Sequence, residues 1–114
     1  MANGAERLTT AQWTKVAGLL GLGVRARTVV VGVEQAKFAV KKGRVSLAVL
    51  ADDASPNSKA KVEPVLQARR VQVLGGMTTQ QLGAVVGREA TAVVVVVDAA
   101  LARGIRGAMV PAAG

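Results

Sequence analysis

The apolar residues of this chain form four short runs, separated by longer segments whose apolar positions have helical spacing. The runs are of strand length and consist mainly of valine, leucine and alanine: Val29–Val31, Ser46–Ala51, Val71–Leu74 and Thr91–Val97. Runs without polar alternation are typical of strands that are covered on both faces of a sheet. The pattern therefore predicts an α/β fold, a three-layer α/β/α sandwich around a mixed four-stranded sheet.

Two of the intervening helices begin with the same local signals. Each start has a threonine and a glutamine at the spacing of a capping box, Thr9 with Gln12 and Thr78 with Gln81. An apolar residue before each box is placed to pack against one inside the helix, as a hydrophobic staple. The first of these helices is predicted to end at Gly21 and Gly23, and the later one at Gly87.

Two further helices have other start signals. Ser55 as N-cap and Pro56 as first residue predict a helix that runs to about Arg70. Pro64 lies inside this segment and predicts a kink or a late start, because proline lacks the N–H of an internal helix position. Asp98 is placed to cap a short final helix that runs through Arg103.

The stretch from Thr28 to Arg44 combines a strand, a turn and a helix start. Gly32 permits a sharp turn between the strand and the helix. Such a junction presents free backbone N–H groups and the positive end of the helix dipole, which stabilise an anion such as a phosphate. On a helical wheel, a cationic flank lies beside the buried arc, and Phe38 points away from that arc. The flank consists of Lys37, Lys41 and Arg44, and the arc of Val33, Ala36, Ala39 and Val40.

Charge and composition narrow the possible functions. The chain has 15 Lys and Arg against 7 Asp and Glu, and this net charge of +8 favours a polyanionic partner such as nucleic acid. The alternative is a basic protein whose charge only keeps it dispersed. Cysteine and histidine are both absent, which excludes disulfides, thiolate chemistry and the usual transition-metal ligands. No cofactor and no metal site are predicted.

Length and hydropathy predict the organisation of the chain. The 114 residues suffice for one domain, expected at residues 8–106, with flexible tails at 1–7 and 107–114. The first seven residues have no apolar core of signal-peptide length, and the longest apolar run, Ala92–Val97, is too short to span a bilayer. We expect a cytoplasmic monomer without membrane contact.

Two patterns suggest enzymes and are rejected. Gly21–Ala26 matches the dinucleotide-binding fingerprint, but it follows a helix and precedes a strand, the reverse of the required order. Asp52 and Asp53 follow a strand, as the acceptor of a receiver domain does, but the other acidic pair and the late lysine of that site are missing. The two carboxylates are assigned to loop and helix-cap electrostatics, and no enzymatic activity is expected.

Taken together, the segments resemble the L7Ae and L30e superfamily of ribosomal proteins, small α/β/α domains that bind kink-turn RNA. The similarity to its short bacterial members of the YlxQ type covers residues 8 to about 106 in the right order. It is carried by Leu19–Ala26, by Gly32 and the helix after it, and by Lys41–Gly43, Leu50–Ser55, Leu82–Gly83 and Gly87. The resemblance implies binding to structured RNA, ribosomal or regulatory, with the ribosome or transcription and translation factors as further partners.

The RNA-contacting motif of that family, Gly-x-Asn-Glu-x-x-Lys, aligns with Gly32, Glu34, Gln35 and Phe38. Only the glycine is kept. Glu34 is negative where the family reads a base with Asn, and Phe38 replaces a phosphate-binding Lys, whereas Gln35 can still hydrogen-bond to a base edge. The second contact region aligns with Gly87–Thr91, which is shortened and lacks the apolar pair that covers flipped-out bases.

Two functions of different classes remain. The first is RNA binding, in which the basic residues track phosphates while Phe38 and Gln35 contact unstacked bases. The predicted site consists of Gly32, Glu34, Gln35, Lys37, Phe38, Lys41, Lys42, Arg44 and Arg88. The alternative is a protein-interaction module of the same fold that has lost kink-turn recognition, in which the lysines form a solvated helix face. A steep salt dependence of binding would favour RNA.

Overall fold

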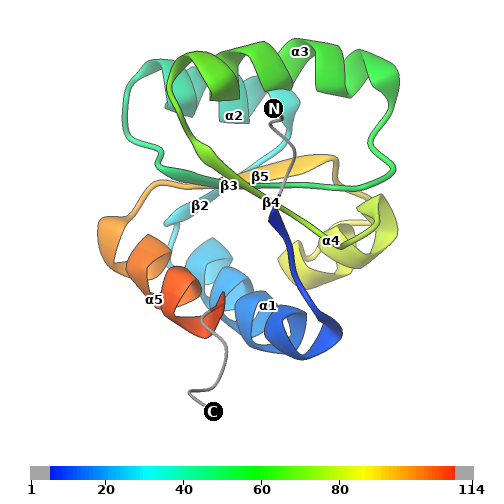
Figure 1. Ribbon diagram of the computed structural model, residues 1–114, viewed down its shortest axis with the longest axis vertical. Helices are drawn as coiled ribbons and strands as arrows, with labels where there is room; N and C mark the ends of the chain where they lie inside the picture. Colours follow the sequence, from blue (N-terminus) through cyan, green and yellow to red (C-terminus); the bar gives the residue numbers. More distant parts are fainter. Residues whose placement is uncertain (1–5, 110–114) are drawn as a thin grey trace.

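The computed structural model describes residues 6–109, in which five strands form a single sheet (Figure 1). The strands are β1 (Glu6–Arg7), β2 (Val29–Val31), β3 (Leu47–Leu50), β4 (Gln72–Gly75) and β5 (Val93–Val96). Their spatial order is β1, β4, β3, β5, β2. The pairs β1–β4 and β3–β4 are parallel, whereas β5 is antiparallel to both β3 and β2. The predicted mixed sheet of four strands is therefore confirmed, and β1 extends it by one short strand.

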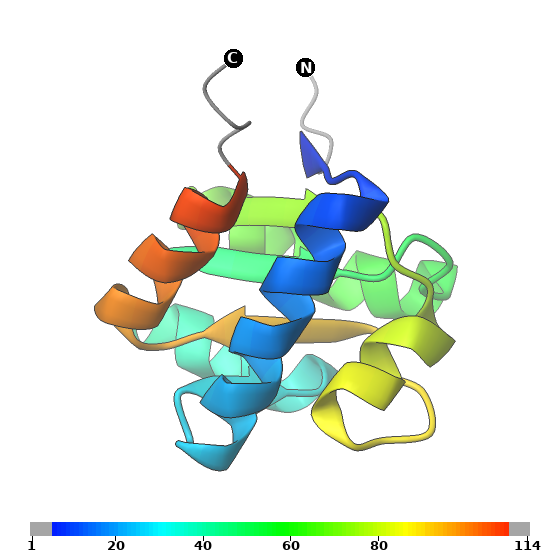
Figure 2. The same ribbon diagram turned by 90° about the horizontal axis from the view of Figure 1, so that it is seen from below.

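Helices cover both faces of this sheet. One face carries α2 (Val33–Lys41) and α3 (Pro56–Ala68), which pack side by side (Figure 1). The other face carries α1 (Thr10–Arg25), α4 (Thr79–Val86) and α5 (Ala99–Met109), with α1 between the other two (Figure 2). This arrangement confirms the three-layer α/β/α sandwich.

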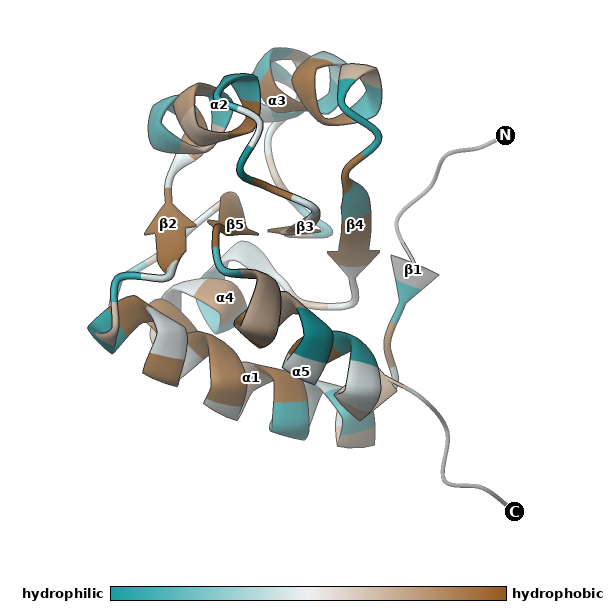
Figure 3. Cartoon of the chain, turned by 90° about the vertical axis from the view of Figure 1, so that its left-hand side faces the viewer, coloured by the Kyte–Doolittle hydropathy of each residue, from teal (hydrophilic) through white to brown (hydrophobic). Residues whose placement is uncertain are grey.

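The core lies in the two spaces between the sheet and its helices. Every residue of β3 and β5 is buried, because the flanking helices exclude water from both faces of these inner strands. Figure 3 shows the apolar strands β2 and β5 between the two layers of helices. Leu20 and Ile105 fill the space on one side, while Val40 and Leu66 fill the other. No helix within residues 6–109 is long and apolar enough to cross a membrane.

The predicted helix starts are confirmed. Thr9 caps α1 and Thr78 caps α4, each with the reciprocal side-chain contact of a capping box. Ser55 caps α3, with Pro56 as its first residue. The α3 helix passes through Pro64, so the expected late start is wrong. Gly87 ends α4 in the left-handed conformation, with φ of 77°, as the sequence predicts.

The first helix does not end at Gly21 and Gly23 but continues to Arg25. Neither glycine has a positive φ. A Cβ on Gly23 would lie 2.5 Å from side-chain atoms of Leu101 and Val29. This glycine therefore permits the close approach of α1 to β2 and α5, and it does not terminate the helix.

Residues 6–7 and 107–109, which are predicted to belong to flexible tails, lie in β1 and α5. Glu6 and Arg7 pair with β4, and the Arg7 guanidinium lies 3.1 Å from the Asp52 carboxylate. At the other end, α5 runs beyond Arg103 as far as Met109, because Ile105 and Met109 are buried. Residues 1–5 and 110–114 lie outside the described part of the chain.

Candidate nucleic-acid interface

The start of α2 is joined directly to the start of β5. Gly32 is the N-cap of α2 and has φ of 105°, a conformation that L side chains rarely adopt. Its N–H donates to the carbonyl of Val93 at 3.0 Å. Among residues 6–109 no side chain caps this helix, so backbone groups form the amino-terminal end of α2.

The loop between α4 and β5, residues 87–92, reaches the same end of the sheet, since it leads into Val93. Its position is set by close backbone contacts with α4. The Arg88 N–H donates to the carbonyl of Gly83 at 2.7 Å, and the Thr91 N–H donates to the carbonyl of Thr79 at 3.0 Å. The structure therefore brings the exposed Arg88 and the start of α2 to one end of the molecule.

Glu34 lies between two lysines. Its carboxylate oxygens are 3.9 Å from the ammonium groups of Lys37, one turn further along α2, and of Lys61 on α3. The negative charge at this position therefore engages cations of the protein itself. Lys61 was not predicted as part of the site, because it comes close to Glu34 only through the packing of α3 against α2.

Phe38 is exposed, as the wheel predicts. Its side chain is 64% exposed, and the ammonium group of Lys42 lies 4.8 Å from the ring centroid, a cation–π contact. The ring borders a shallow depression of about 360 Å³ that is lined by Val30, Glu34, Gln35, Phe38 and Ala39. An open aromatic face beside a side-chain amide is suited to an unstacked base.

The predicted site residues fall into two groups. Gly32, Glu34 and Gln35 lie in the first turn of α2, near the loop that carries Arg88. The second group, Lys41, Lys42 and Arg44, lies at or beyond the other end of this helix, about 13 Å away at 1.5 Å per residue. Only Lys42 connects the groups, through its contact with Phe38.

Both carboxylates that follow β3 bind backbone groups. Asp52 accepts a hydrogen bond from the N–H of Gly76 at 2.9 Å, in addition to its ion pair with Arg7. Asp53 accepts from the N–H of Thr79 at 2.7 Å, at the first residue of α4. Asp52 and Asp53 therefore make the predicted loop and helix-start contacts. The helix that Asp53 contacts is α4, not α3, which follows Asp53 in the chain. Within residues 6–109, no group of three or more acidic side chains is placed to hold a metal ion.

Comparison with known proteins places this architecture in a family. The model of the ribosomal protein L7Ae/L30e/S12e/Gadd45 family matches residues 14–103, which run from the second turn of α1 into the first half of α5. The chain belongs to this family. Within it, the chain is 36% identical over 80 residues to the RNA-binding protein YlxQ of Bacillus subtilis (strain 168), covering 70% of this chain and 80% of that protein.

Solved structures agree with the family assignment. A protein of unknown function from Bacillus halodurans C is 33% identical, with a TM-score of 0.75 over 83% of this chain and 96% of the other. The 15.5kD RNA binding protein of Giardia lamblia has the same fold, with a TM-score of 0.75 at 17% identity over 89% of this chain and 87% of that one. The fold is thus shared with a protein in which most of the sequence differs.

Proposed function

We propose that this protein binds structured RNA, with the start of α2 and the α4–β5 loop as the surface that contacts bases. Membership of the L7Ae/L30e family supports this, as do the net charge of +8 and the similarity to a Bacillus protein named for RNA binding. The observation that carries the proposal is the junction at Gly32, where an uncapped helix start, the α4–β5 loop and exposed Gln35 meet. Such a junction offers N–H donors to RNA phosphates and an amide to a base edge.

The RNA preference is altered from that of a standard kink-turn. Glu34 holds Lys37 and Lys61 in ion pairs, which lowers the positive charge that these lysines offer to phosphates. Phe38 removes one cation from α2 and adds an aromatic face. We propose that an unpaired base stacks on this face, with Lys42 positioned to contact the adjoining phosphate.

The first test uses Phe38→Ala and a hairpin RNA with an unpaired loop. Loss of one stacked base is expected to weaken binding by about 1–3 kcal/mol, which is roughly 5- to 150-fold in Kd. Phe38→Tyr keeps the ring and is the matched control, with affinity close to that of the original protein. Equal affinities for the alanine and tyrosine variants would contradict the stacking proposal.

The second test changes the preference of the protein for a kink-turn over a straight duplex. The double variant Glu34→Asn, Phe38→Lys frees Lys37 and Lys61 and adds a cation, so it is expected to bind a kink-turn RNA more tightly than the original protein does. A straight duplex of matched length should gain much less. Titration of both RNAs with both proteins measures the ratio of the kink-turn affinity to the duplex affinity. If the double variant is folded but binds the kink-turn more weakly than the original protein, the proposed roles of Glu34 and Phe38 are wrong.

A protein-interaction module would behave differently in the same titrations. Binding to RNA phosphates weakens steeply with salt, by roughly 0.7 to 0.9 log units per neutralised phosphate for each tenfold increase. Salt-independent binding of the hairpin would therefore contradict the RNA proposal. Sequencing the RNA that copurifies with the protein identifies whether the partner is ribosomal or regulatory.

A further inference from the structure

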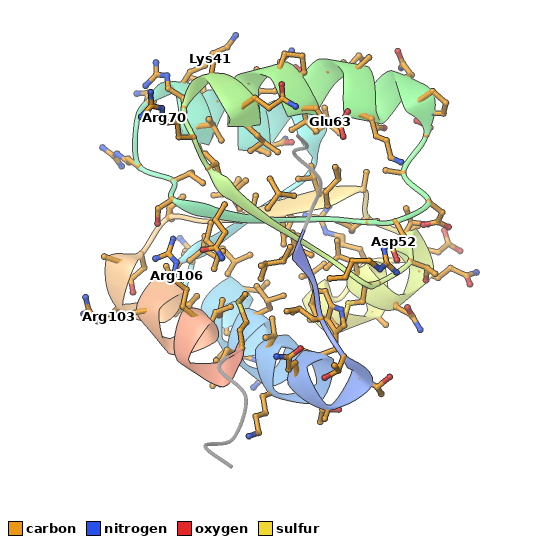
Figure 4. All side chains as sticks on the ribbon, viewed as in Figure 1. Lys41, Asp52, Glu63, Arg70, Arg103 and Arg106 are labelled. Atoms are coloured by element: carbon orange, nitrogen blue, oxygen red, sulfur yellow. The ribbon has the colours of Figure 1, made fainter. Side chains whose placement is uncertain are left out.

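A second cationic surface lies at the opposite end of the sheet from Gly32. Figure 4 shows Lys41, Arg70, Arg103 and Arg106 on one side of the molecule, with Asp52 on the other. The chain order adds two arginines, one after α1 and one after α2. We define the cationic end as Arg27, Lys41, Arg44, Arg70, Arg103 and Arg106.

Hydrogen bonds hold these segments together. The carbonyl of Ser46, two residues after Arg44, accepts from the N–H of Gln72 and from the guanidinium of Arg106, each at 3.0 Å. The Arg106 Nε also donates to Gln72 Oε1 at 2.7 Å. The N–H of Val97 donates to the carbonyl of Thr28 at 2.9 Å, which connects the segment after Arg27 to the segment before α5. The cationic end is therefore a contiguous surface on α5 and the segments that precede β2, β3 and β4.

Most of its cations are not neutralised. Arg27, Arg44, Arg70 and Arg103 are exposed, and none of them takes part in an ion pair within residues 6–109. The acidic residue at this end, Asp98, uses its carboxylate to accept from the N–H of Leu101 at 2.8 Å. The surface therefore carries a concentrated positive charge that only solvent or a partner can balance.

Two of these arginines occupy strained backbone positions. Arg27 and Arg70 have φ of 63° and 55° and are the two left-handed residues other than glycine within residues 6–109. They follow α1 and α3, where the chain must turn out of the helix. At the equivalent places after α2 and α4 the chain has Gly43 and Gly87, the residue type that avoids this strain. A strained residue that a glycine would replace without cost indicates a functional requirement for its side chain.

Compensation of helix dipoles does not account for these arginines. Cations near helix carboxyl ends are favourable. Arg69 is the C-cap residue of α3, and its guanidinium donates to the carbonyl of Lys41, the last residue of α2, at 2.9 Å. Arg25 lies in the last turn of α1 and supplies the same charge from ordinary helical backbone. The end of α1 therefore has a cation without Arg27, and the C-cap position of α3 has one without Arg70.

We infer that the cationic end is a second RNA-contacting surface, which binds the phosphate backbone of a duplex. Several exposed guanidinium groups with few acidic neighbours match a polyphosphate, whereas the centre of a protein–protein interface is depleted of charge. Because the α2 helix separates it from Gly32, this surface engages a different RNA segment from the start of α2. Phe38 is nearer, one turn before Lys41, but it carries no charge, so the salt slope reports on the cationic end and not on stacking at Phe38.

The test is the double variant Arg27→Gly, Arg70→Gly, titrated with a labelled RNA duplex at several salt concentrations. Loss of two phosphate contacts is expected to lower the affinity about tenfold or more and the log–log salt slope by roughly 2. The melting temperature should stay the same or rise, because glycine relieves the left-handed backbone. A purely structural role predicts no change in binding.

Three comparisons make the result decisive. The pair Lys15→Gln, Lys59→Gln removes the same charge from the first halves of α1 and α3, outside the cationic end, and should leave the slope unchanged. The pair Arg44→Ala, Arg103→Ala has ordinary backbone and should weaken binding like the glycine pair. Phe38→Ala should not alter the duplex slope. The inference would be overturned if both arginine pairs had the same log–log salt slope as the lysine control. It would also be overturned if poly-glutamate bound as tightly as the duplex and this binding depended on the same arginines, because that result would indicate an acidic protein partner.

Discussion

Trp13→Ala is expected to lower the free energy of unfolding by about 3–5 kcal/mol, the range typical for removal of a buried aromatic side chain. Trp13 is 6% exposed, and its indole Nε1 donates to the carbonyl of Gly75 at 3.2 Å. The ring connects α1 to the end of β4. Since small domains have a total stability of about 5–15 kcal/mol, this one change removes a large share of it. Urea denaturation measures the difference.

Trp13→Phe is the matched control, because it keeps most of the apolar ring and removes the N–H donor. The carbonyl of Gly75 also accepts from the N–H of Leu8 at 3.2 Å, so it is not left without a partner. We therefore expect a loss near 1 kcal/mol for phenylalanine. A phenylalanine variant as unstable as the alanine variant would mean that the hydrogen bond, and not the packing, dominates.

Gly83→Ala is expected to destabilise the protein by about 2–3 kcal/mol and to weaken RNA binding as well. A Cβ on Gly83 would lie 2.8 Å from backbone atoms of Ala90 and 2.9 Å from the carbonyl oxygen of Arg88. Backbone cannot give way as a flexible side chain does, so the α4–β5 loop must move. Denaturation and RNA titration of the same variant measure both effects.

Gly18→Ala is the control for the change of residue type. Gly18 lies inside α1, and a Cβ there would meet no atom within 4 Å. Alanine should therefore stabilise the protein by about 0.5–1 kcal/mol through its higher helix propensity. If Gly83→Ala were also stabilising, the close packing of the loop against α4 would not be a constraint on the fold.

Much of the fold could be predicted from the sequence because its signals are local. The capping boxes at Thr9 and Thr78 satisfy backbone groups within three residues, so a short segment contains the whole interaction. The valines of β5 show by composition alone that the strand is buried. The role of Gly23 could not be predicted in this way, because it depends on Leu101 from a distant helix.

The candidate site could be predicted only in part, because some of its contacts join segments that are far apart in the sequence. Helical periodicity placed Phe38 on the solvent side of α2, where the structure has it. The same periodicity placed Arg44 with Lys37 and Lys41 on one flank of the helix, although α2 ends at Lys41 and Arg44 lies beyond it. The pairing of Glu34 with Lys61 depends on how two helices pack, which no single segment of the sequence contains.

The strand order has a consequence for how the chain folds as it is synthesised. In the part of the chain that the structure describes, β2 pairs only with β5, which lies between β2 and β3. Residues 29–31 can therefore pair only after residues 93–96 have been synthesised. This takes on the order of 3–12 s at typical elongation rates of about 5–20 residues per second. The nascent chain can form helices and the β3–β4 pair in this time, but three valines stay without a partner strand. The sheet closes only when almost the whole domain has been translated.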